Sequence, residues 1–161
     1  MQFDSIIKNV RLARPNTDTV DLVDIAIKDG KFALIEADIP ISAATEIIEG
    51  NKLLAFPGLV DTHMHVGIYS PLAEDAVTES KAAAMGGGTT AGTYFRTGQY
   101  YLNKGGPYAD FYPEVLDTSE GNYTVDYAYH LAPIASSHID EMESLLTDHG
   151  VCSFKIFMFY G

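Results

Sequence analysis

The first 55 residues alternate between short runs of β-branched or apolar residues and turn signals. These runs predict five short strands, at residues 5–10, 22–27, 31–35, 45–48 and 52–55. Asp29-Gly30 separates the second run from the third and is typical of a tight hairpin turn, and Gly50-Asn51 predicts a turn between the last two. Strands this short cannot cover both of their faces, so residues 1–55 are expected to need a partner sheet or domain.

From residue 54 onward the pattern changes to an alternation of apolar strands and helices. Strands are predicted at residues 54–60, 89–95, 124–131 and 151–159, and helices at residues 76–85, 110–118 and 139–149. The last helix has the strongest signals, because Ser137 and Asp140 resemble a capping box and Gly150 follows its end. Strands that alternate with helices in this way predict a parallel sheet and an α/β fold.

The sequence ends on its fourth predicted strand, with no helix after it to cover that strand. An eight-stranded α/β barrel takes roughly 250 residues, so the pattern suggests the N-terminal part of such a barrel and a truncated chain. The alternative is a complete small α/β domain with four parallel strands. Its sheet edges and its N-terminal strands would then lack partners.

Composition and charge narrow the classes of function. The chain has 161 residues, 47% of them hydrophobic, and its 10 Lys and Arg against 22 Asp and Glu give a net charge of −12. A surface this acidic repels phosphate backbones and anionic lipids, so neither nucleic acid nor a membrane is an expected partner. The single cysteine, Cys152, permits no internal disulfide. Neither a signal peptide nor a long apolar run is found, so a soluble cytoplasmic protein is predicted.

A pair of histidines stands directly after the apolar run 54–60. His63 and His65 lie two residues apart, so in an extended segment both side chains point to the same side and can reach one metal ion. Asp61 has the same parity and could orient one imidazole. A single histidine is more often an ordinary core or surface residue, but for two at this spacing both interpretations stay open.

Lys155 lies among apolar residues in the last predicted strand. Burial there would disfavour the ammonium form and favour the neutral amine. A neutral amine can add carbon dioxide and become a carbamate, an anionic group with two oxygens that suits two divalent cations. From the residue pattern alone, a lysine whose charged end reaches solvent at a strand end is the preferred interpretation.

Two motifs taken together resemble one family. Residues 56–65 read FPGLVDTHMH, and residues 153–160 read SFKIFMFY. With the turn at residues 87–90 and the strand patterns at residues 4–9 and 24–31, they resemble the amidohydrolase superfamily, in the branch of dihydropyrimidinases and D-hydantoinases. The resemblance covers the whole chain, which corresponds to the N-terminal third of such enzymes.

The resemblance implies a fold and a site. Residues 56–161 would form the first half of a (β/α)8 barrel, and residues 1–55 would be part of a small β-sandwich. Two divalent metal ions, usually zinc, are implied: His63 and His65 would bind the more buried ion, and Lys155, carrying a carbamate derived from CO2, would bridge both. Tyr160 takes the position of a catalytic tyrosine that hydrogen-bonds the substrate carbonyl. The family's other metal ligands and its proton-shuttling aspartate lie on later strands, and His130, at the end of the third strand, has no ligand role in it.

The implied activity is hydrolysis of a cyclic amide. A hydroxide that bridges the two metals would open a hydantoin or dihydropyrimidine ring to an N-carbamoyl amino acid. The implied partners are a small cyclic ureide as substrate and further copies of the protein, as a tetramer. The 161-residue chain alone is expected to be inactive, because it holds only part of the site.

Other functions stay open beside this one. Some relatives are non-catalytic scaffold proteins that keep the fold and lose the metal ligands, whereas His63, His65 and Lys155 are all present here. A dihydroorotase or an allantoinase-type cyclic amidohydrolase is another alternative. Dihydroorotases usually have an arginine two residues after the histidine pair, where this chain has Val66-Gly67, so dihydroorotate is disfavoured and a neutral ring is expected.

Overall fold

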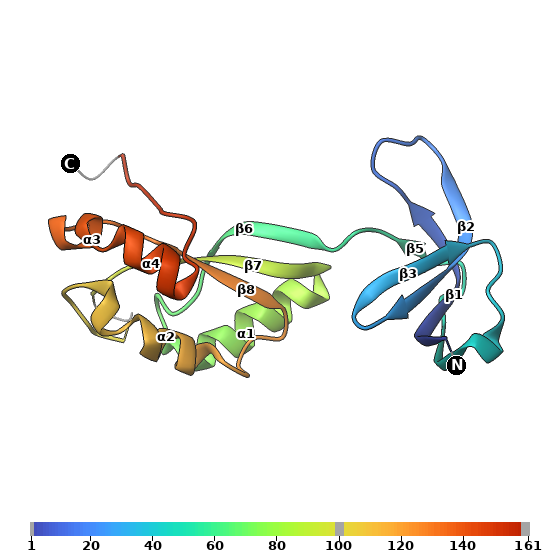
Figure 1. Cartoon of the computed structure of the whole chain (residues 1–161), viewed down its shortest axis with the longest axis horizontal. Coiled ribbons are helices and arrows are strands. Elements are labelled where there is room, and N and C mark those ends of the chain that lie inside the picture. Colours follow the sequence, from blue (N-terminus) through green and yellow to red (C-terminus); the bar gives the residue numbers. More distant parts are fainter. Residues whose placement is uncertain (1, 99–101, 159–161) are drawn as a thin grey trace. The chain divides into compact units, whose positions relative to one another are not determined.

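The computed structural model describes residues 2–98 and 102–158 (Figure 1). The chain divides into two compact units, residues 1–57 and residues 58–161. The sequence pattern predicted a change of organisation near residue 55, and the two units are described separately below.

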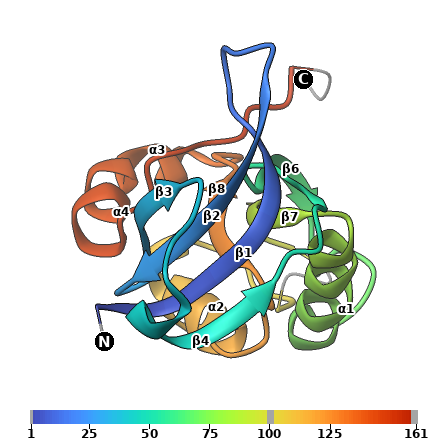
Figure 2. The same cartoon turned by 90° about the vertical axis from the view of Figure 1, so that its right-hand side faces the viewer.

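The first unit is a five-stranded sheet. Its strands are β1 (Phe3–Ala13), β2 (Val20–Lys28), β3 (Lys31–Glu36), β4 (Ala44–Glu49) and β5 (Leu54–Ala55), with a short 3-10 turn, η1 (Ile41–Ala43), before β4. The order is β3-β2-β1-β4, and β5 also pairs with β1. The β2–β3 hairpin turns at Asp29-Gly30, where both residues have positive φ as a type I′ turn requires. Figure 2 shows β1 and β2 running on together as a long two-stranded arm.

The sheet of the first unit buries little of its apolar surface. Small groups of apolar side chains pack on its two faces, around Ile6 and Ala26 on one side and Val10 and Val23 on the other. Other large apolar side chains remain exposed: Val20, Leu22, Phe32, Leu53, Leu54 and Phe56. Strands β1 and β2 run beyond their predicted ends, because they remain paired as far as Ala13 and Val20.

The second unit is a three-stranded parallel sheet with helices between its strands. Its strands are β6 (Leu59–His65), β7 (Gly88–Phe95) and β8 (Asp126–Leu131), in that order. The helices are α1 (Leu72–Met85), η2 (Tyr108–Asp110), α2 (Tyr112–Ser119), α3 (Ser136–Asp140) and α4 (Met142–His149). Figure 1 shows α1 and α2 on the same side of the sheet, where they contact each other. The alternation predicted from the sequence is confirmed as a mixed α/β arrangement.

The predicted strand 54–60 is wrong as a single element. It is split into β5, which pairs with β1, and the start of β6, which pairs with β7. Pro57 stands between them and has no N–H to give to a strand ladder. Gly58 lies so close to β7 that a Cβ there would be 2.2 Å from the side chain of Thr89. The histidine pair consequently lies inside β6 and not in a loop after a strand.

The predicted helix 139–149 is also wrong as a single element, because it is interrupted at Glu141. Helix α3 begins after Ala135, and no side chain caps it, so the capping box expected at Ser137 does not form. The carboxylate of Glu141 accepts hydrogen bonds from the backbone N–H groups of Tyr108 (2.7 Å) and Ala109 (2.9 Å), which draws the side chain toward η2. Gly150 ends α4 in the left-handed conformation, as predicted.

The predicted strand 151–159 does not form over the residues described, which end at 158. Only one parallel bridge joins this segment to the sheet, between Leu131 and Phe154. Leu131 is the last residue of β8, so the residues after Phe154 have no further residue of β8 to pair with. It is called the C-terminal segment below (residues 151–158).

Aromatic side chains form the core of the second unit. Phe95 and Tyr129 meet edge to face, with ring centroids 5.7 Å apart. The hydroxyl of buried Tyr108 donates to the carbonyl of Ala132 at 2.6 Å, and burial raises the pKa of Tyr112 to about 12. None of the helices in residues 2–98 and 102–158 is long and apolar enough to cross a membrane.

Candidate metal centre

Two histidines stand side by side on β6. The rings of His63 and His65 are stacked, with centroids 5.1 Å apart and planes 5° from parallel, and their Nε2 atoms are 3.1 Å apart. This arrangement follows from the spacing, since side chains two residues apart on a strand point the same way. Both side chains are exposed, because β6 is an outer strand of the sheet β6-β7-β8.

Asp61 supports the backbone that carries His63. The pairing of β6 with β7 shifts by one residue between Asp61 and Met64, so the strand bulges there. Within the bulge, Oδ1 of Asp61 accepts a hydrogen bond of 2.9 Å from the backbone N–H of His63. The sequence suggested that Asp61 orients an imidazole ring. The hydrogen bond in the described part of the chain goes to the main chain beneath that ring, and the orienting role stays a prediction.

Lys155 reaches the histidine pair from the C-terminal segment. Its Nζ lies 3.1 Å from Nε2 and 3.5 Å from Nδ1 of His63, and 5.4 Å from the centroid of the Phe157 ring. The side chain is half-buried, and the neighbouring Ile156 and Met158 are 72% and 97% exposed. The apolar enclosure expected from the neighbouring sequence is thus not formed, yet the lysine and both histidines come together.

The three side chains put basic nitrogen atoms close together. Burial lowers the pKa of His65 below its ordinary value, and the neighbouring charges of His63 and Lys155 lower it further. Within residues 2–98 and 102–158, no group of three or more His, Cys, Asp and Glu side chains is placed to hold a metal ion. His63, His65 and a neutral Lys155 would therefore bind a cation through the lone pairs of their nitrogen atoms.

A cavity of about 210 Å³ lies behind the histidine pair. It is lined by Thr62, His63, Tyr94, His130, Ser153, Phe154 and Lys155. The sequence placed His130 at the end of a strand facing a pocket, and the structure puts it on this wall. Ser153 went unnoticed in the sequence, although its position two residues before Lys155 was a signal that both side chains share one side of the segment.

One predicted site residue cannot be placed. Tyr160, predicted to contact the substrate carbonyl, lies outside the described residues.

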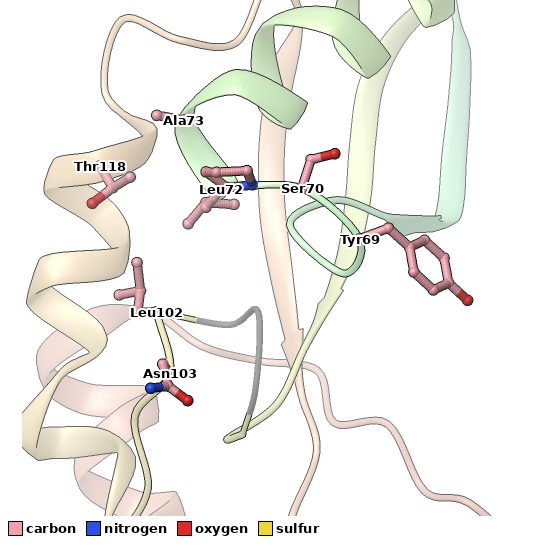
Figure 3. A pocket seen from close by; sticks show the side chains of 8 residues that line it. Tyr69, Ser70, Leu72, Ala73, Leu102, Asn103 and Thr118 are labelled. Atoms are coloured by element: carbon pink, nitrogen blue, oxygen red, sulfur yellow. The ribbon is translucent and has the colours of Figure 1, made fainter.

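A larger cavity, of about 690 Å³, lies away from the histidines. Its walls come from the loop and first residues of α1, from a second loop and from α2, as Figure 3 shows: Tyr69, Ser70, Pro71, Leu72, Ala73, Leu102, Asn103 and Thr118. Tyr69 is 88% exposed, and its ring turns away from the other labelled side chains. The described residues of this lining include no histidine, carboxylate or lysine, so the side chains able to hold a metal ion are those of His63, His65 and Lys155.

Comparison with known proteins assigns the chain to a family. No protein-family profile matches the chain. D-hydantoinase from Ralstonia pickettii is 32% identical, over 98% of this chain and 34% of that protein, and allantoinase from Escherichia coli is 35% identical, over 98% and 33%. The solved structure of dihydropyrimidinase from Brevibacillus agri superposes with a TM-score of 0.79 at 25% identity, over 97% of this chain and 33% of that one. The chain thus spans about a third of the length of these relatives, and over that N-terminal portion it belongs to the hydantoinase branch of the amidohydrolase superfamily.

Proposed function

We propose that the protein carrying this chain is a metal-dependent hydrolase that opens cyclic amide rings. The observation that carries the proposal is the convergence of three nitrogen atoms: Nε2 of His63 lies 3.1 Å both from Nε2 of His65 and from Nζ of Lys155. Its relatives are hydantoinases, an allantoinase and a dihydropyrimidinase. Non-catalytic relatives are expected to lack these ligands, so their presence together favours an enzyme.

The histidine pair fits one divalent cation. Two nitrogens bound to one tetrahedral zinc at about 2.05 Å lie roughly 3.3 Å apart, close to the 3.1 Å between the two Nε2 atoms. Neutral imidazole is a preferred zinc ligand, and the lowered pKa of His65 keeps that ring neutral to lower pH. When bound, the metal would polarise a carbonyl and activate water. His63 and His65 would hold this metal ion at the edge of the sheet.

Lys155 is proposed to carry a carbamate. The lone pair of the neutral Nζ adds to the carbon of CO2, one C–O bonding pair moves onto oxygen, and one proton leaves the nitrogen for solvent. Counted from the ammonium form, which must first lose one proton to solvent to give the neutral amine, two protons leave in all, and a cation beside His63 that repels metal becomes an anion that binds it. The two oxygen atoms of the carbamate would allow it to bind a second metal ion beside the first.

The chain supplies part of the proposed site and fold. By family resemblance, the remaining ligands and the aspartate that moves the proton come from later strands of a (β/α)8 barrel, of which β6, β7 and β8 would be the first three. The activity is accordingly proposed for the longer protein. Tyr160 would donate a hydrogen bond to the ring carbonyl as charge develops on its oxygen.

A second candidate substrate is a cyclic amide that carries a carboxylate. The loop after His65 offers no arginine, and this favours a neutral ring, because a buried carboxylate without a cation is costly. However, Arg96 lines a cavity of about 600 Å³ together with Lys155. The presence of the Arg96 cation in a cavity that Lys155 also lines favours this second candidate substrate.

Turnover by the full-length protein tests the proposal. We expect hydantoin or dihydrouracil to be hydrolysed, activity to be lost with a chelator and restored by zinc, and kcat/KM for dihydroorotate to be lower. His63→Asn and Lys155→Met should each lower metal content and kcat at least a hundredfold, while His149→Asn, at the end of α4, should change neither. Zinc bound at these residues without turnover of any cyclic amide would contradict the proposed activity and leave only the metal site. A higher kcat/KM for dihydroorotate that Arg96→Gln abolishes would establish the second candidate.

A further inference from the structure

The C-terminal segment is attached to β8 at one point. Two backbone hydrogen bonds make this attachment: the N–H of Leu131 donates to the carbonyl of Ser153 (3.3 Å), and the N–H of Lys155 donates to the carbonyl of Leu131 (2.9 Å). A side-chain hydrogen bond of 2.6 Å, between Nδ1 of His130 and Oγ of Ser153, lies beside them. Among the residues described, this side-chain bond is the shortest of the three.

The bond between His130 and Ser153 lies on the same cavity wall as Lys155. Ser153 and Lys155 are two residues apart in an extended segment, so their side chains leave on the same side, and both line the 210 Å³ cavity with His63. Other contacts of the described segment with the sheet are the bridge at Leu131 and the ring of Phe157, whose centroid lies 5.2 Å from that of Tyr94 on β7. Without the bond at Ser153, the residues between these contacts could turn about the axis of the segment. Such a rotation would carry Nζ of Lys155 away from Nε2 of His63, now 3.1 Å distant.

The other ring nitrogen of His130 indicates which atom is the donor in the hydrogen bond between His130 and Ser153. Nε2 is buried and has no hydrogen-bond partner among the residues described. A buried N–H without an acceptor is rarer than an acceptor without a donor, so Nδ1 is assigned the proton and donates it to Ser153. Gly92 makes room for the ring, because a Cβ at that position would lie 2.6 Å from Nε2.

We propose that His130 is a positioning residue that acts through Ser153 to hold Lys155 beside His63 for carbamate formation. The inference rests on the proposed function, since it concerns the same lysine. His130 itself forms no covalent bond: the bond that forms joins Nζ of Lys155 to the carbon of CO2, with one proton lost from nitrogen to solvent. Its role is to keep Nζ where the carbamate can meet the metal held by His63.

Amide substitutions at position 130 separate positioning from packing. His130→Asn places an amide N–H near the position of Nδ1, whereas His130→Gln places one near the position of Nε2. Ser153→Ala removes the hydroxyl and Ser153→Thr retains it. These variants of the full-length protein, with His149→Asn as a control, are loaded with zinc in ¹³C-bicarbonate. The ¹³C carbamate signal and the zinc retained per chain are measured, together with the thermal unfolding midpoint.

Carbamate and zinc should fall at least fivefold in His130→Gln and Ser153→Ala, and should stay within twofold of the native protein in His130→Asn, Ser153→Thr and the control. Unfolding midpoints should not follow this order. Equal behaviour of the Asn and Gln variants, unchanged carbamate in Ser153→Ala, or losses that merely track the unfolding midpoint would overturn the positioning role. A native protein that shows neither carbamate nor zinc would refute the proposed function, and this inference with it. A native protein that shows both, beside unaffected variants, would refute this inference alone.

Discussion

Asp24 shows how a single buried charge organises the first unit. Its side chain is 1% exposed, and it accepts hydrogen bonds from the Lys8 ammonium and from the backbone N–H groups of Asn9 (2.8 Å) and Ile39 (2.8 Å). Asn9 lies in a bulge of β1 and has a positive φ, so its N–H lies outside the regular ladder. One carboxylate therefore ties the bulge of β1 to the connection before η1.

Replacing Asp24 by Asn should destabilise the first unit. The amide keeps the shape but loses the charge, and one of its two acceptor positions becomes a donor that faces a backbone N–H, so we expect a loss of about 1–3 kcal/mol in the free energy of unfolding. Asp38→Asn is the matched control, since Asp38 also contacts Lys8 but its side chain is 86% exposed. Hydrogen exchange at the amides of Asn9 and Ile39 measures the effect locally. Equal effects of the two substitutions would contradict this account.

The same contact predicts how stability depends on pH. Burial by itself raises the pKa of Asp24, but the hydrogen bonds from Lys8, Asn9 and Ile39 outweigh it and hold the pKa below its ordinary value. The unfolded chain consequently binds a proton first as the pH falls, at about pH 3.9. The stabilisation is present above that pH and is lost as the pH falls through the folded pKa. Asp24→Asn should flatten this acid limb of an unfolding curve.

At the level of residues, sequence reasoning succeeded where one local rule sufficed. The period of two in a strand was enough to place His63 and His65 on one side. Residue chemistry alone favoured an ordinary solvent-facing Lys155, and only the motif around it pointed to the histidines. Glu141 and Ser153 act on partners 33 and 23 residues away, and no local pattern carries such contacts.

Elements were predicted well where hydrophobic periodicity and turn signals agreed. The five strands of the first unit, the helix–strand alternation of the second and the end of α4 at Gly150 all follow from local patterns. The failures lie at two positions. The strand predicted across Pro57 is divided between two units, and the helix predicted across Glu141 is interrupted at the residue whose carboxylate contacts η2. The segment 151–158 has strand-like composition but meets β8 only at Leu131.

The bulge in β6 predicts a measurable role for Asp61. Asp61→Ala removes the acceptor for the His63 N–H, so the histidine backbone loses its support and zinc affinity should fall about tenfold or more. Asp61→Asn keeps an acceptor oxygen and should retain most of the affinity. Competition with a chromogenic chelator on the full-length protein gives both values. The role fails if the Ala variant binds zinc like the native protein, or if Asn behaves like Ala.

The contact between Glu141 and η2 predicts a stability effect away from the metal centre. Glu141→Ala leaves the N–H groups of Tyr108 and Ala109 without their acceptor. We expect a loss of about 1.5–3 kcal/mol in the free energy of unfolding, with zinc content unchanged. Glu143→Ala, an exposed position on α4, is the control and should change stability by less than about 0.5 kcal/mol. A change in zinc content on Glu141→Ala would show that the two regions are coupled.

At the scale of the whole molecule, each of the two units leaves part of its sheet uncovered. Its second unit is a sheet of three strands plus one bridge, and β6, which bears the histidines, is exposed along its outer side. The sheet of the first unit likewise leaves Phe32 and Phe56 largely exposed. The sequence already predicted that both sheets would be partly uncovered. The strands of the first unit are too short to cover both of their faces, and the last predicted strand of the second unit has no helix after it.

This incompleteness leads to the last prediction, that the 161-residue chain alone does not hydrolyse hydantoin or dihydrouracil. A divalent zinc site takes four ligands in its common geometry, and the chain brings together two imidazoles and one lysine. Zinc should therefore bind the chain at least a hundredfold more weakly than the full-length protein, and the exposed His63 and His65 cannot exclude water from a reacting ring. The measurement is turnover and zinc affinity for both proteins side by side, with His63→Asn in each. Turnover by the short chain that a chelator abolishes and His63→Asn removes would show that half of the proposed barrel is a sufficient catalyst.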